Sequence, residues 1–557
     1  MKSFLAKDRS WLTDLLWLSL VIGIVSFITL GIPSLFTPDE GRYAEIPREM
    51  LASGNFIIPH LDGVIYFEKP PLIYWLTAFF MHCFGYSEWA VRTINGLFSV
   101  LGCLSIYAAS RKLFNRRTGI LAALIASSSL LYISINHMLT MDAGLSFFMT
   151  LSLLSFMLGL RATHRTKQSL WFWAAYLCAG LAFLCKGLIG IVFPMMIIGL
   201  WILLLNRWYV LKQMRIVSGL MLFLAVTLPW LILTQHAVPT FFHEFFIIEE
   251  FARYATPVEH RHMALLSYIA VLVLGFFPWT VWIVQSIRYN LPTSWKLRQL
   301  SAEPLFLVVW AGAITLFFAC SHSILIPYLL PIIPPLAILT ARYIDSHWEL
   351  GLNKSQKISI SLFIAICIII SFALIVLPKF QFIARPHLTY PLLVLTALSF
   401  LIAGLMSLYF WCRNQFKKLI ITMVVLPWFI MNLVWVASPY IVNRSIQPLA
   451  ADLKPLLQQN PAAVVVSFRT YYQDLPYYIQ RKVVIIDWQD ELQYGLDTDP
   501  QVKTWMYDDA GLWKMWSGPQ TVYMIMSQGD YQAQSSSHRL YVIDQTSNDV
   551  LITNRKP

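Results

Sequence analysis

The sequence predicts an integral membrane protein with about thirteen membrane-spanning helices and a small α/β domain at its C-terminal end. Hydrophobic residues make up 57% of the 557 residues and charged residues only 13%, whereas soluble domains are roughly 45–50% apolar. Apolar runs long enough to cross a hydrocarbon layer of about 30 Å recur between residues 12 and 437. Beyond residue 437 the composition changes to short apolar stretches with polar connections, as in a small α/β domain.

The apolar runs define the predicted spans. They lie near residues 12–32, 89–110, 118–136, 142–160, 169–185, 187–205, 216–234, 264–287, 305–320, 324–341, 358–377, 390–411 and 419–437. Three basic residues precede the first run, and no small-residue cleavage site follows a short apolar core. We therefore expect an uncleaved first membrane helix rather than a signal peptide.

Basic residues are distributed unevenly between the two sets of connecting loops. The N-terminus and the loops at 111–117, 161–168, 206–215, 288–304, 342–357 and 412–418 carry about 22 Lys and Arg, against about 8 in the opposite set. This excess marks the cytoplasmic side of a membrane protein. The net charge of +12 is therefore interpreted as topology and not as a nucleic-acid surface. The loops 33–88 and 235–263 and the C-terminal domain then face outward.

The division of the chain follows from this pattern. Residues 1–437 form the predicted membrane domain, and residues 438–557 form the predicted α/β domain. Its expected strands lie in PAAVVVSF (461–468), RKVVIID (481–487), TVYMIM (521–526) and RLYVID (539–544). The seven cysteines show no metal-like CxxC spacing, so neither a disulfide framework nor a zinc site is inferred.

Charged residues concentrate in the first outward loop, between Thr37 and Tyr74. Asp39 follows the first span, where a carboxylate either caps a helix or binds a substrate group. Arg42 lies one helical turn further on, at a spacing that allows an ion pair with Asp39. Glu68 and Lys69 precede a diproline that stiffens the backbone. They form either an interfacial ion pair or a phosphate-binding edge, since an ammonium is a compact point charge.

A second set of candidates lies in other outward segments. Asp142 begins the fourth predicted span, and Lys186 lies in the turn CKG between two spans. The loop 235–263 has aromatic residues typical of an interfacial helix, and its Arg253 is a candidate phosphate ligand. Tyr328, between two prolines, either packs or hydrogen-bonds a phosphate. Ionisable groups at one membrane face favour an enzyme acting on a lipid over a transporter, because transport sites lie near the bilayer midplane.

Six stretches of the chain carry a resemblance to a known family. They are TPDEGRYAEIPREM, YFEKPPLIYW, LTMDAGL, LAFLCKGLIGIVFP, GFFPW and PYLLPIIPPLA, within residues 10–340 and in this order. They resemble the lipid A aminoarabinose transferases and other polyprenyl-phosphate-sugar-dependent transferases of the protein mannosyltransferase superfamily. The resemblance implies a polytopic α-helical fold of the GT-C type, with a small periplasmic α/β domain at the C-terminus.

The resemblance also implies roles for individual residues. The resemblance implies that the carboxylates of Asp39 and Asp142 are catalytic. It places Arg42, Lys69, Arg253 and Tyr328 around the carrier phosphate, and it makes Glu68 a carboxylate associated with a metal. No cofactor is required, and a divalent metal remains an option. Glu249–Glu250 stand where the family often has a histidine after the glutamate, which weakens metal binding by that loop. We expect Asp39, Lys69, Asp142 and Arg253 to share one cavity at the outer membrane boundary.

The implied activity is transfer of 4-amino-4-deoxy-L-arabinose, with inversion, from undecaprenyl phosphate to lipid A at the periplasmic face of the bacterial inner membrane. Two alternatives stay open at this point. One is a related transferase that uses a hexose or hexosamine and acts on lipid A, core oligosaccharide or protein. The other is a lipid-binding protein or transporter without catalysis. The expected partners are the lipid-linked sugar donor, lipid A or another glycolipid acceptor, and membrane lipids, but no nucleic acid.

Overall fold

The chain folds into two compact units. The computed structural model describes residues 2–252, 265–321, 325–349, 353–376, 386–441, 445–488, 490–499, 502 and 505–556. One unit, here called the helical unit, comprises Met1–Pro33 and Arg92–Val442. The other, the mixed unit, comprises Ser34–Val91 and Asn443–Pro557. The first outward loop, predicted as part of the membrane domain, is thus grouped with the C-terminal segment.

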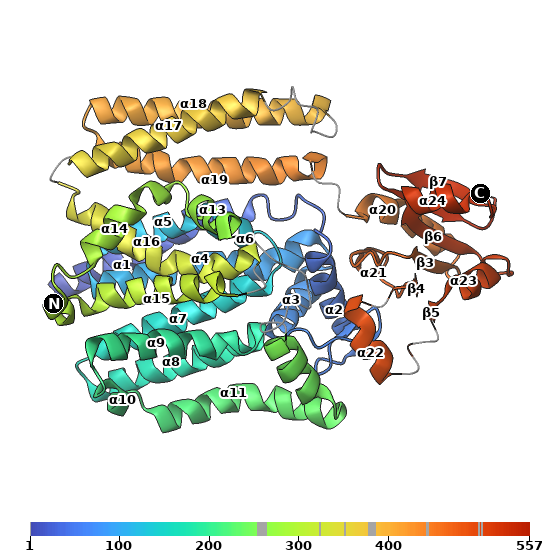
Figure 1. The fold of residues 1–557 in the computed structure, drawn as a ribbon, viewed down its shortest axis with the longest axis horizontal. Helices are drawn as coiled ribbons and strands as arrows, with labels where there is room; N and C mark the ends of the chain where they lie inside the picture. The colour runs from blue at the N-terminus through green and yellow to red at the C-terminus, as the bar shows by residue number, and fades with distance from the viewer. Residues whose placement is uncertain are drawn as a thin grey trace. The chain divides into compact units, whose positions relative to one another are not determined.

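The helical unit contains long apolar helices joined by short turns (Figure 1). They are α1 (Lys2–Phe27), α4 (Glu88–Leu113), α5 (Arg116–Ser127), α6 (Leu130–Asn136), α7 (Met141–Arg161), α8 (Arg165–Lys186), α9 (Ile189–Leu205), α10 (Val210–Gln213), α11 (Ile216–Ala237), η1 (His243–Ala252), α13 (Leu265–Gly275), η2 (Trp279–Trp282), α14 (Ile283–Asn290), η3 (Trp295–Ser301), α15 (Ala302–Ala319), η4 (Ile326–Ile332), α16 (Ile333–Ser346), α17 (Lys354–Val376), α18 (Pro386–Cys412) and α19 (Phe416–Ile441). Of these, α17, α18 and α19 pack side by side.

The number of spans differs from the prediction. Within the described ranges, ten helices are long and apolar enough to cross a membrane, or up to twelve if each of two bent pairs is one span. The predicted count of thirteen is therefore not confirmed. The additional prediction is 187–205, which corresponds to α9. This helix has only 17 residues, about 25 Å at 1.5 Å per residue, and is short for a bilayer core of about 30 Å. The chain is a multi-pass membrane protein.

Two predicted spans are bent helix pairs. The run 118–136 consists of α5 and α6, which meet at 63°, and the run 264–287 bends by 97° between Leu266–Gly275 and Trp279–Asn290. Pro278 lies at the second break, where its missing N–H prevents continuation of the helix. At the first break, the hydroxyl of Ser128 donates to the carbonyl of Ile125 and accepts from the indole of Trp279. Other parts of the protein thus satisfy polar groups that a broken helix exposes.

A buried aspartate fixes the first helix against its neighbours. Asp14 of α1 is fully buried. Its carboxylate accepts from the hydroxyl of Tyr107 at 2.7 Å, from Arg111 Nη1 at 2.8 Å and from Arg116 Nε at 2.6 Å. Arg116 Nη2 binds the second carboxylate oxygen at 2.6 Å. One acid therefore joins α1 to α4 and α5.

Replacing Asp14 with asparagine is expected to destabilise the helical unit by about 1.5–3 kcal/mol, since charge-assisted hydrogen bonds are lost within a buried site. Thermal unfolding of the purified protein in detergent measures the change. Glu349→Gln is the matched control, because Glu349 also pairs with an arginine, Arg117, at 3.2 Å, but 66% of its side chain is exposed. Exposed pairs contribute about 0–1 kcal/mol. Equal losses in both variants would contradict the role given to Asp14.

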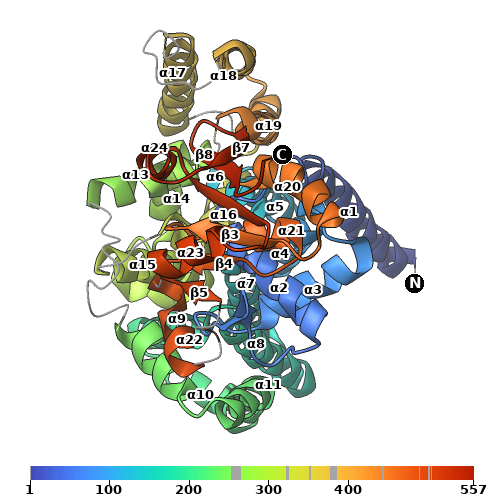
Figure 2. The same cartoon turned by 90° about the vertical axis from the view of Figure 1, so that its right-hand side faces the viewer.

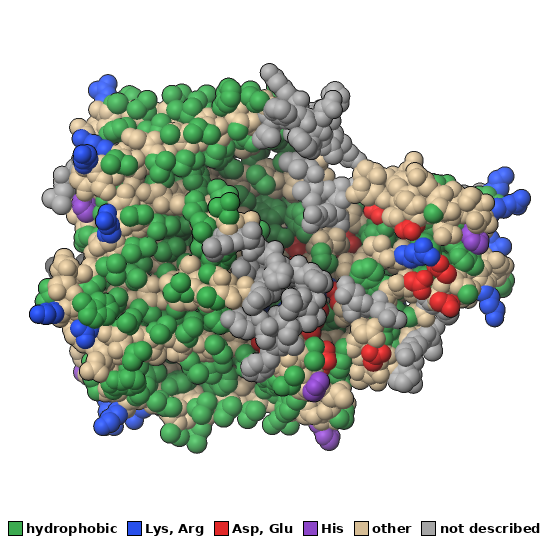
Figure 3. Space-filling model, in the orientation of Figure 1, with side chains coloured by type: hydrophobic (Ala, Val, Ile, Leu, Met, Phe, Trp, Pro, Cys, Tyr) green, Lys and Arg blue, Asp and Glu red, His purple; other side chains and the backbone are tan. Residues whose placement is uncertain are grey.

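The surface of the helical unit agrees with a membrane protein. Hydrophobic side chains cover the sides of its helices in Figure 3, and lysine and arginine side chains gather at one end. The basic loops singled out in the sequence lie at helix ends, with Arg116 and Arg117 in the first turn of α5 and Lys417 in the first turn of α19. Charged ends and apolar sides are typical of helices in a bilayer.

The mixed unit contains a six-stranded sheet with helices against it, facing the viewer in Figure 2. The strand order is β5-β4-β3-β6-β8-β7. The pairs β4–β5, β3–β4 and β3–β6 are parallel, and β6–β8 and β7–β8 are antiparallel. The elements of this segment are α20 (Gln447–Gln459), β3 (Val464–Phe468), α21 (Leu475–Ile479), β4 (Val484–Ile486), η6 (Asp490–Leu492), α22 (Gln493–Thr498), β5 (Met506–Tyr507), α23 (Asp509–Trp516), β6 (Val522–Ser527), α24 (Gln528–Gln534), β7 (Tyr541–Gln545) and β8 (Asp549–Thr553).

All four strands expected from the apolar stretches are present, as β3, β4, β6 and β7. The prediction missed β5, which has two residues, and β8, which follows directly on β7. The core of the sheet is formed by strand and helix residues that are almost fully buried. They are Val466, Phe468, Ile486, Leu512, Trp516, Val522, Met524, Met526, Val550 and Ile552. The central strands β3 and β6 are apolar on both faces, as expected for buried parallel strands.

The first loop contributes α2 (Asp39–Ser53), the hairpin β1 (His60–Leu61) and β2 (Val64–Ile65), and α3 (Leu72–Phe84) to the mixed unit. Close backbone approaches join it to the C-terminal segment. A Cβ at Gly41 would lie 2.6 Å from the backbone nitrogen of Asp474, so only glycine allows this approach. In addition, the backbone N–H of Val483 donates to the carboxylate of Asp62 at 2.9 Å. The helix that carries Asp39 and Arg42 is therefore held by residues more than 400 positions further on.

Candidate functional site

The N-terminal turn of α2 positions the first pair of candidates. The helix begins at Asp39, and its first turn contains Asp39 and Glu40. Glu40 reaches back to accept from the backbone N–H of Phe36 at 2.9 Å. Asp39 lies 3.3 Å from Arg42 Nη2, at the i,i+3 spacing that the sequence indicates. The side chain of Asp39 is 58% exposed, so its carboxylate is accessible to a substrate.

Arg42 is surrounded by carboxylates. Its Nη1 lies 2.6 Å from Glu491 Oε2 and 3.9 Å from Glu68 Oε2, and donates to the hydroxyl of Tyr66 at 3.1 Å. Burial acts to lower the pKa of Arg42, but Tyr66, Glu491 and Glu68 together raise it well above its ordinary value. Arg42 is therefore a permanent cation. Its buried Nε has no hydrogen-bond partner among the residues that the structure describes.

Glu68 and Lys69 join this cluster from the segment before α3. Lys69 Nζ donates to the backbone carbonyl of Glu68 at 2.9 Å and lies 3.9 Å from Glu68 Oε2. The side chain of Lys69 is 18% exposed. We call Asp39, Arg42, Glu68, Lys69 and Glu491 the Arg42 group. With three carboxylates and two cations, it carries an excess of one negative charge.

The helical unit brings a second set of residues together, here called the Lys186 group. Asp142 lies in the first turn of α7, and Lys186 is the last residue of α8. Lys186 Nζ forms an ion pair and a hydrogen bond with the carboxylate of Asp142. The same Nζ lies 3.9 Å from the centre of the Tyr328 ring, in a cation–π contact. Both charged side chains are about nine-tenths buried, at 8% and 10% exposure.

The loop after α11 approaches this second group. Its first part is the π-helix η1, which confirms a helix within the aromatic stretch. Glu250 of η1 lies so close to Gly187 that an added Cβ would collide with its carboxylate. Gly187 also has a φ of +87°, a conformation that glycine adopts without strain. Arg253, predicted as a phosphate ligand, lies outside the described residues.

The structure therefore groups the predicted residues in two sets. Asp39, Arg42, Glu68 and Lys69 come together in the mixed unit, and Asp142 and Tyr328 come together in the helical unit. The common cavity expected for Asp39, Lys69, Asp142 and Arg253 stays a prediction. Two charged partners were not assigned as site residues. The sequence around Lys186 marks it as unusual, because it is an isolated cation at the end of an apolar run. The sequence around Glu491 does not distinguish it from other acidic residues.

Three arginines of the chain are buried. Arg42, Arg48 and Arg92 are 6%, 7% and 0% exposed. Arg92 donates to the backbone carbonyls of Leu30 and Pro33, at 3.0 and 2.7 Å. An arginine can be buried when backbone carbonyls or carboxylates accept from most of its donors.

Metal binding by Glu68 finds no support in the geometry. Within the described ranges, no group of three or more His, Cys, Asp or Glu side chains lies in position to hold a metal ion. Glu68 faces Arg42 and Lys69 instead. Because two cations already neutralise this carboxylate, no catalytic step is assigned to a metal here.

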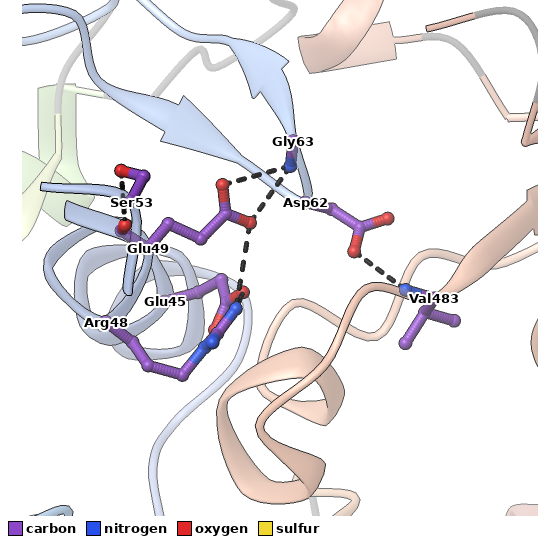
Figure 4. A network of polar contacts seen from close by, with 7 residues as sticks. All are labelled: Glu45, Arg48, Glu49, Ser53, Asp62, Gly63 and Val483. Atoms are coloured by element: carbon purple, nitrogen blue, oxygen red, sulfur yellow. Dashed lines mark hydrogen bonds and ion pairs between the residues drawn. The ribbon is translucent and has the colours of Figure 1, made fainter. Parts of the chain in front are cut away.

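The C-terminal half of α2 carries a second network (Figure 4). Arg48 donates through Nε and Nη2 to the two oxygens of Glu45, both at 2.6 Å. Glu49 accepts from the backbone N–H of Gly63, at 2.9 and 3.1 Å. Gly63 and Asp62 form the turn of the hairpin and have φ values of 77° and 51°. An Asp-Gly turn with positive φ at both residues is the preferred two-residue hairpin connection. The network thus fixes the hairpin to α2.

Asp62 gives this network a pH dependence. Its side chain is fully buried, and burial raises its pKa from 3.8 to about 8, although the N–H of Val483 acts to lower it. The native state therefore keeps a proton that the unfolded chain loses above pH 4. The stabilisation is present at low pH and is lost as the pH rises from about 4 to about 8, by on the order of 5 kcal/mol.

Asp62→Asn is expected to remove this dependence, because asparagine still accepts from Val483 and does not titrate. Thermal unfolding between pH 5 and pH 9 should then show a smaller decline in melting temperature than the unchanged protein. Asp487→Asn is the matched control, since Asp487 lies in the same unit with a φ of 49° and is exposed. An unaltered pH profile in Asp62→Asn would contradict the buried titration.

Comparison with known proteins matches two segments of the chain to family models. Residues 68–233 match the dolichyl-phosphate-mannose-protein mannosyltransferase family. Residues 449–554 match the aminoarabinose transferase C-terminal domain. The first segment begins at Glu68 and includes Lys69, Asp142 and Lys186, and the second contains Glu491.

Curated relatives are named undecaprenyl phosphate-α-4-amino-4-deoxy-L-arabinose arabinosyl transferases. The one from Proteus mirabilis is 29% identical over 63% of this chain and 64% of its own. The one from Pectobacterium carotovorum is 33% identical over 56% of this chain and 55% of its own. The chain thus spans less than two thirds of the length of these relatives.

The solved structures extend the similarity to the whole chain. The crystal structure of ArnT from Cupriavidus metallidurans bound to undecaprenyl phosphate matches with a TM-score of 0.86 and 25% identity, and covers 98% of both chains. The resemblance to the aminoarabinose transferases of the GT-C type is therefore confirmed, in two segments of the sequence and in the fold of the whole chain.

Proposed function

We propose that this chain is a glycosyltransferase that moves 4-amino-4-deoxy-L-arabinose from undecaprenyl phosphate to lipid A. The names of the relatives and the solved structure with undecaprenyl phosphate support the donor. Lipid A as the acceptor follows from the resemblance in the sequence. Adding an amino sugar makes lipid A less anionic, which weakens the binding of cationic peptides.

The observation that carries the choice of sugar is the charge of the Arg42 group. Three carboxylates face two cations, and the exposed one is Asp39. A neutral hexose offers no cation to the exposed carboxylate of Asp39. A protonated amino sugar supplies one positive charge and an N–H donor to a carboxylate, an interaction stronger than a neutral hydrogen bond.

The reaction needs little proton transfer. The bond between the anomeric carbon and the carrier phosphate breaks, and its electron pair stays on the departing phosphate. An oxygen of the acceptor forms the new bond from the opposite side, which inverts the anomeric carbon. The enzyme must therefore stabilise negative charge on the leaving phosphate. Lys69 is the group in the mixed unit assigned to this task, and preorganised donors of this kind act strongly because they need no reorganisation.

The acceptor decides whether a base is required. A phosphate oxygen of lipid A is already anionic, so Asp39 then only orients the amino sugar. A hydroxyl acceptor would need a general base, and Asp39 is the accessible carboxylate for it. In the Lys186 group, Asp142 holds the lysine ammonium and Tyr328 adds its ring and hydroxyl. We assign this group to binding a phosphate, with Lys186 as its cation.

The proposed location is the bacterial inner membrane, with the mixed unit in the periplasm. The support is the excess of basic residues in one set of loops, which marks the cytoplasmic side. Accessibility labelling of Cys83, an exposed cysteine in the mixed unit, tests the orientation. A membrane-impermeant maleimide should label it in intact spheroplasts, and labelling only after lysis would contradict the proposal.

Mass spectrometry of lipid A from cells with and without this chain tests the function. An added pentosamine is the expected product, and an added hexose or hexosamine has a different mass. A Lys69→Ala chain expressed at the same level is the control for catalysis. Unchanged lipid A in cells that make the unaltered protein and its donor would contradict the assignment.

A further inference from the structure

A cavity lies within the mixed unit, beside the C-terminal half of α2. It has a volume of about 430 Å³. Its walls come from α2, the turn after it, the hairpin and the segment before β4, and its charged lining residues are Arg48, Glu49, Arg481 and Lys482, with His60. We propose that this cavity binds a phosphate group of the anionic glycolipid acceptor, away from the reacting oxygen. This inference rests on the proposed function for the identity of the acceptor.

Two cations of this cavity, Arg481 and Lys482, form no close ion pair with a carboxylate among the described residues, although Lys482 acts on the buried Asp62 from a greater distance. Arg481 donates only to the backbone carbonyls of Pro461 and Ala463, at 3.3 and 3.4 Å. The ammonium of Lys482 lies 4.4 Å from the centre of the Trp505 ring and makes no hydrogen bond in this part of the chain. Like charges side by side on neighbouring residues repel each other, and an anion between them and Arg48 removes that repulsion.

The acidic lining residue does not compete for these cations. Both oxygens of Glu49 accept from the backbone N–H of Gly63, and Arg48 Nη2 lies 3.9 Å away. Figure 4 shows this carboxylate turned toward the hairpin backbone and Arg48. The charge of Glu49 is thus already compensated, and a ligand meets Arg481 and Lys482 as a net positive wall.

Lys482 lies beside the hairpin although it is exposed. A Cβ added at Gly63 would collide with the ammonium of Lys482, so the lysine lies directly against the hairpin turn. Burial and the neighbouring Lys482 lower the pKa of His60 against the opposing effect of Glu49, so its ring is neutral at pH 7. The positive charge at this wall therefore comes from the arginines and Lys482 and not from His60.

The chemistry of the lining selects phosphate. Arginine offers a fork of donors and lysine a point charge, and the two are the usual ligands of phosphate oxygens. A divalent cation is excluded as the ligand, because three of the lining residues are cations. The cavity lies about 9 Å along α2 from Arg42, at 1.5 Å for each of six residues. A glycolipid with more than one phosphate therefore reaches both places on this helix.

Binding of fluorescent lipid A to the purified protein in detergent tests the inference. The variants are Arg481→Gln and Lys482→Gln, and the control is Lys514→Gln, an exposed lysine of the same unit without a partner among the described residues. Each cavity variant should weaken lipid A binding about tenfold, the usual effect of losing one charge-assisted hydrogen bond. Lys514→Gln should bind lipid A as tightly as the unaltered protein does. Chemically dephosphorylated lipid A should bind equally well to the cavity variants and to the unaltered protein.

Transfer kinetics form the second arm. The KM for lipid A should rise about tenfold in the cavity variants, with kcat and the KM for the donor unchanged. Lipid A binding that is equal in all variants would overturn the inference, even if the protein transfers the sugar. Variant-dependent binding without sugar transfer would uphold the phosphate site and overturn the proposed function. Displacement of lipid A by equimolar inorganic phosphate would overturn the assignment to a glycolipid and show a free-phosphate site.

Discussion

Replacing Lys69 with alanine is expected to lower the rate of sugar transfer by about 10²–10³-fold, the usual cost of removing one preorganised donor from a developing negative charge. The carrier phosphate gains charge as the sugar departs, and Lys69 is the more exposed of the two cations in the Arg42 group. Its backbone contact with Glu68 already orients the ammonium. Alanine has no charge. Water that replaces the lysine ammonium must reorient during the reaction, whereas the ammonium is already oriented.

The measurement is single-turnover transfer with saturating donor and acceptor. Lys454→Ala, an exposed lysine on α20 of the same unit, is the control and should keep its full rate. Melting temperatures of both variants are measured as well, and that of Lys454→Ala should match the unaltered protein, because an exposed lysine contributes little to stability. A Lys69→Ala rate within twofold of the control would remove Lys69 from the catalytic group.

Replacing Arg42 with methionine should destabilise the mixed unit by about 3–5 kcal/mol, the usual cost of removing one partner from a buried ion pair. The loss removes the cation that lies 2.6 Å from Glu491 and 3.9 Å from Glu68, whose side chains are 9% and 13% exposed. Tyr66 also loses the donor to its hydroxyl. Limited proteolysis and thermal unfolding measure the effect.

The double variant Arg42→Met with Glu491→Gln separates charge from packing. Removing one of the carboxylates that have lost Arg42 should restore part of the lost stability, giving a positive coupling in a double-mutant cycle. The same Glu491→Gln change alone should be destabilising, since it removes the 2.6 Å ion pair. Additive losses in the double variant would show that Arg42 stabilises the unit by packing and not by neutralising carboxylates.

Local rules of the sequence predicted much of the helical unit and one contact of the site. Apolar runs predicted the spans because a bilayer requires a minimum length of apolar helix. The Asp39–Arg42 pair followed from helical spacing, since both residues lie in one turn. The strands β3, β4, β6 and β7 followed from their apolar character, whereas β5 is too short to give a pattern.

Contacts between distant segments could not be predicted in this way. Lys186 and Asp142 are 44 positions apart, and their pairing depends on how α7 packs against α8. The bend at Ser128 has no proline to mark it and depends on contacts that include Trp279. Glu491 follows a strand in a segment with several other acids. Nothing in its surroundings distinguishes it until the chain has folded.

The ion pair between Arg42 and Glu491 also constrains how the protein is made. At about 5–20 residues per second, Glu491 is synthesised roughly 20–90 seconds after Arg42. During that time the segment around Arg42 lacks the nearest of the carboxylates that face it in the folded unit. Factors that shield nascent segments at the membrane surface would therefore be needed most by this loop, and a chain truncated before Glu491 would leave it open to proteolysis.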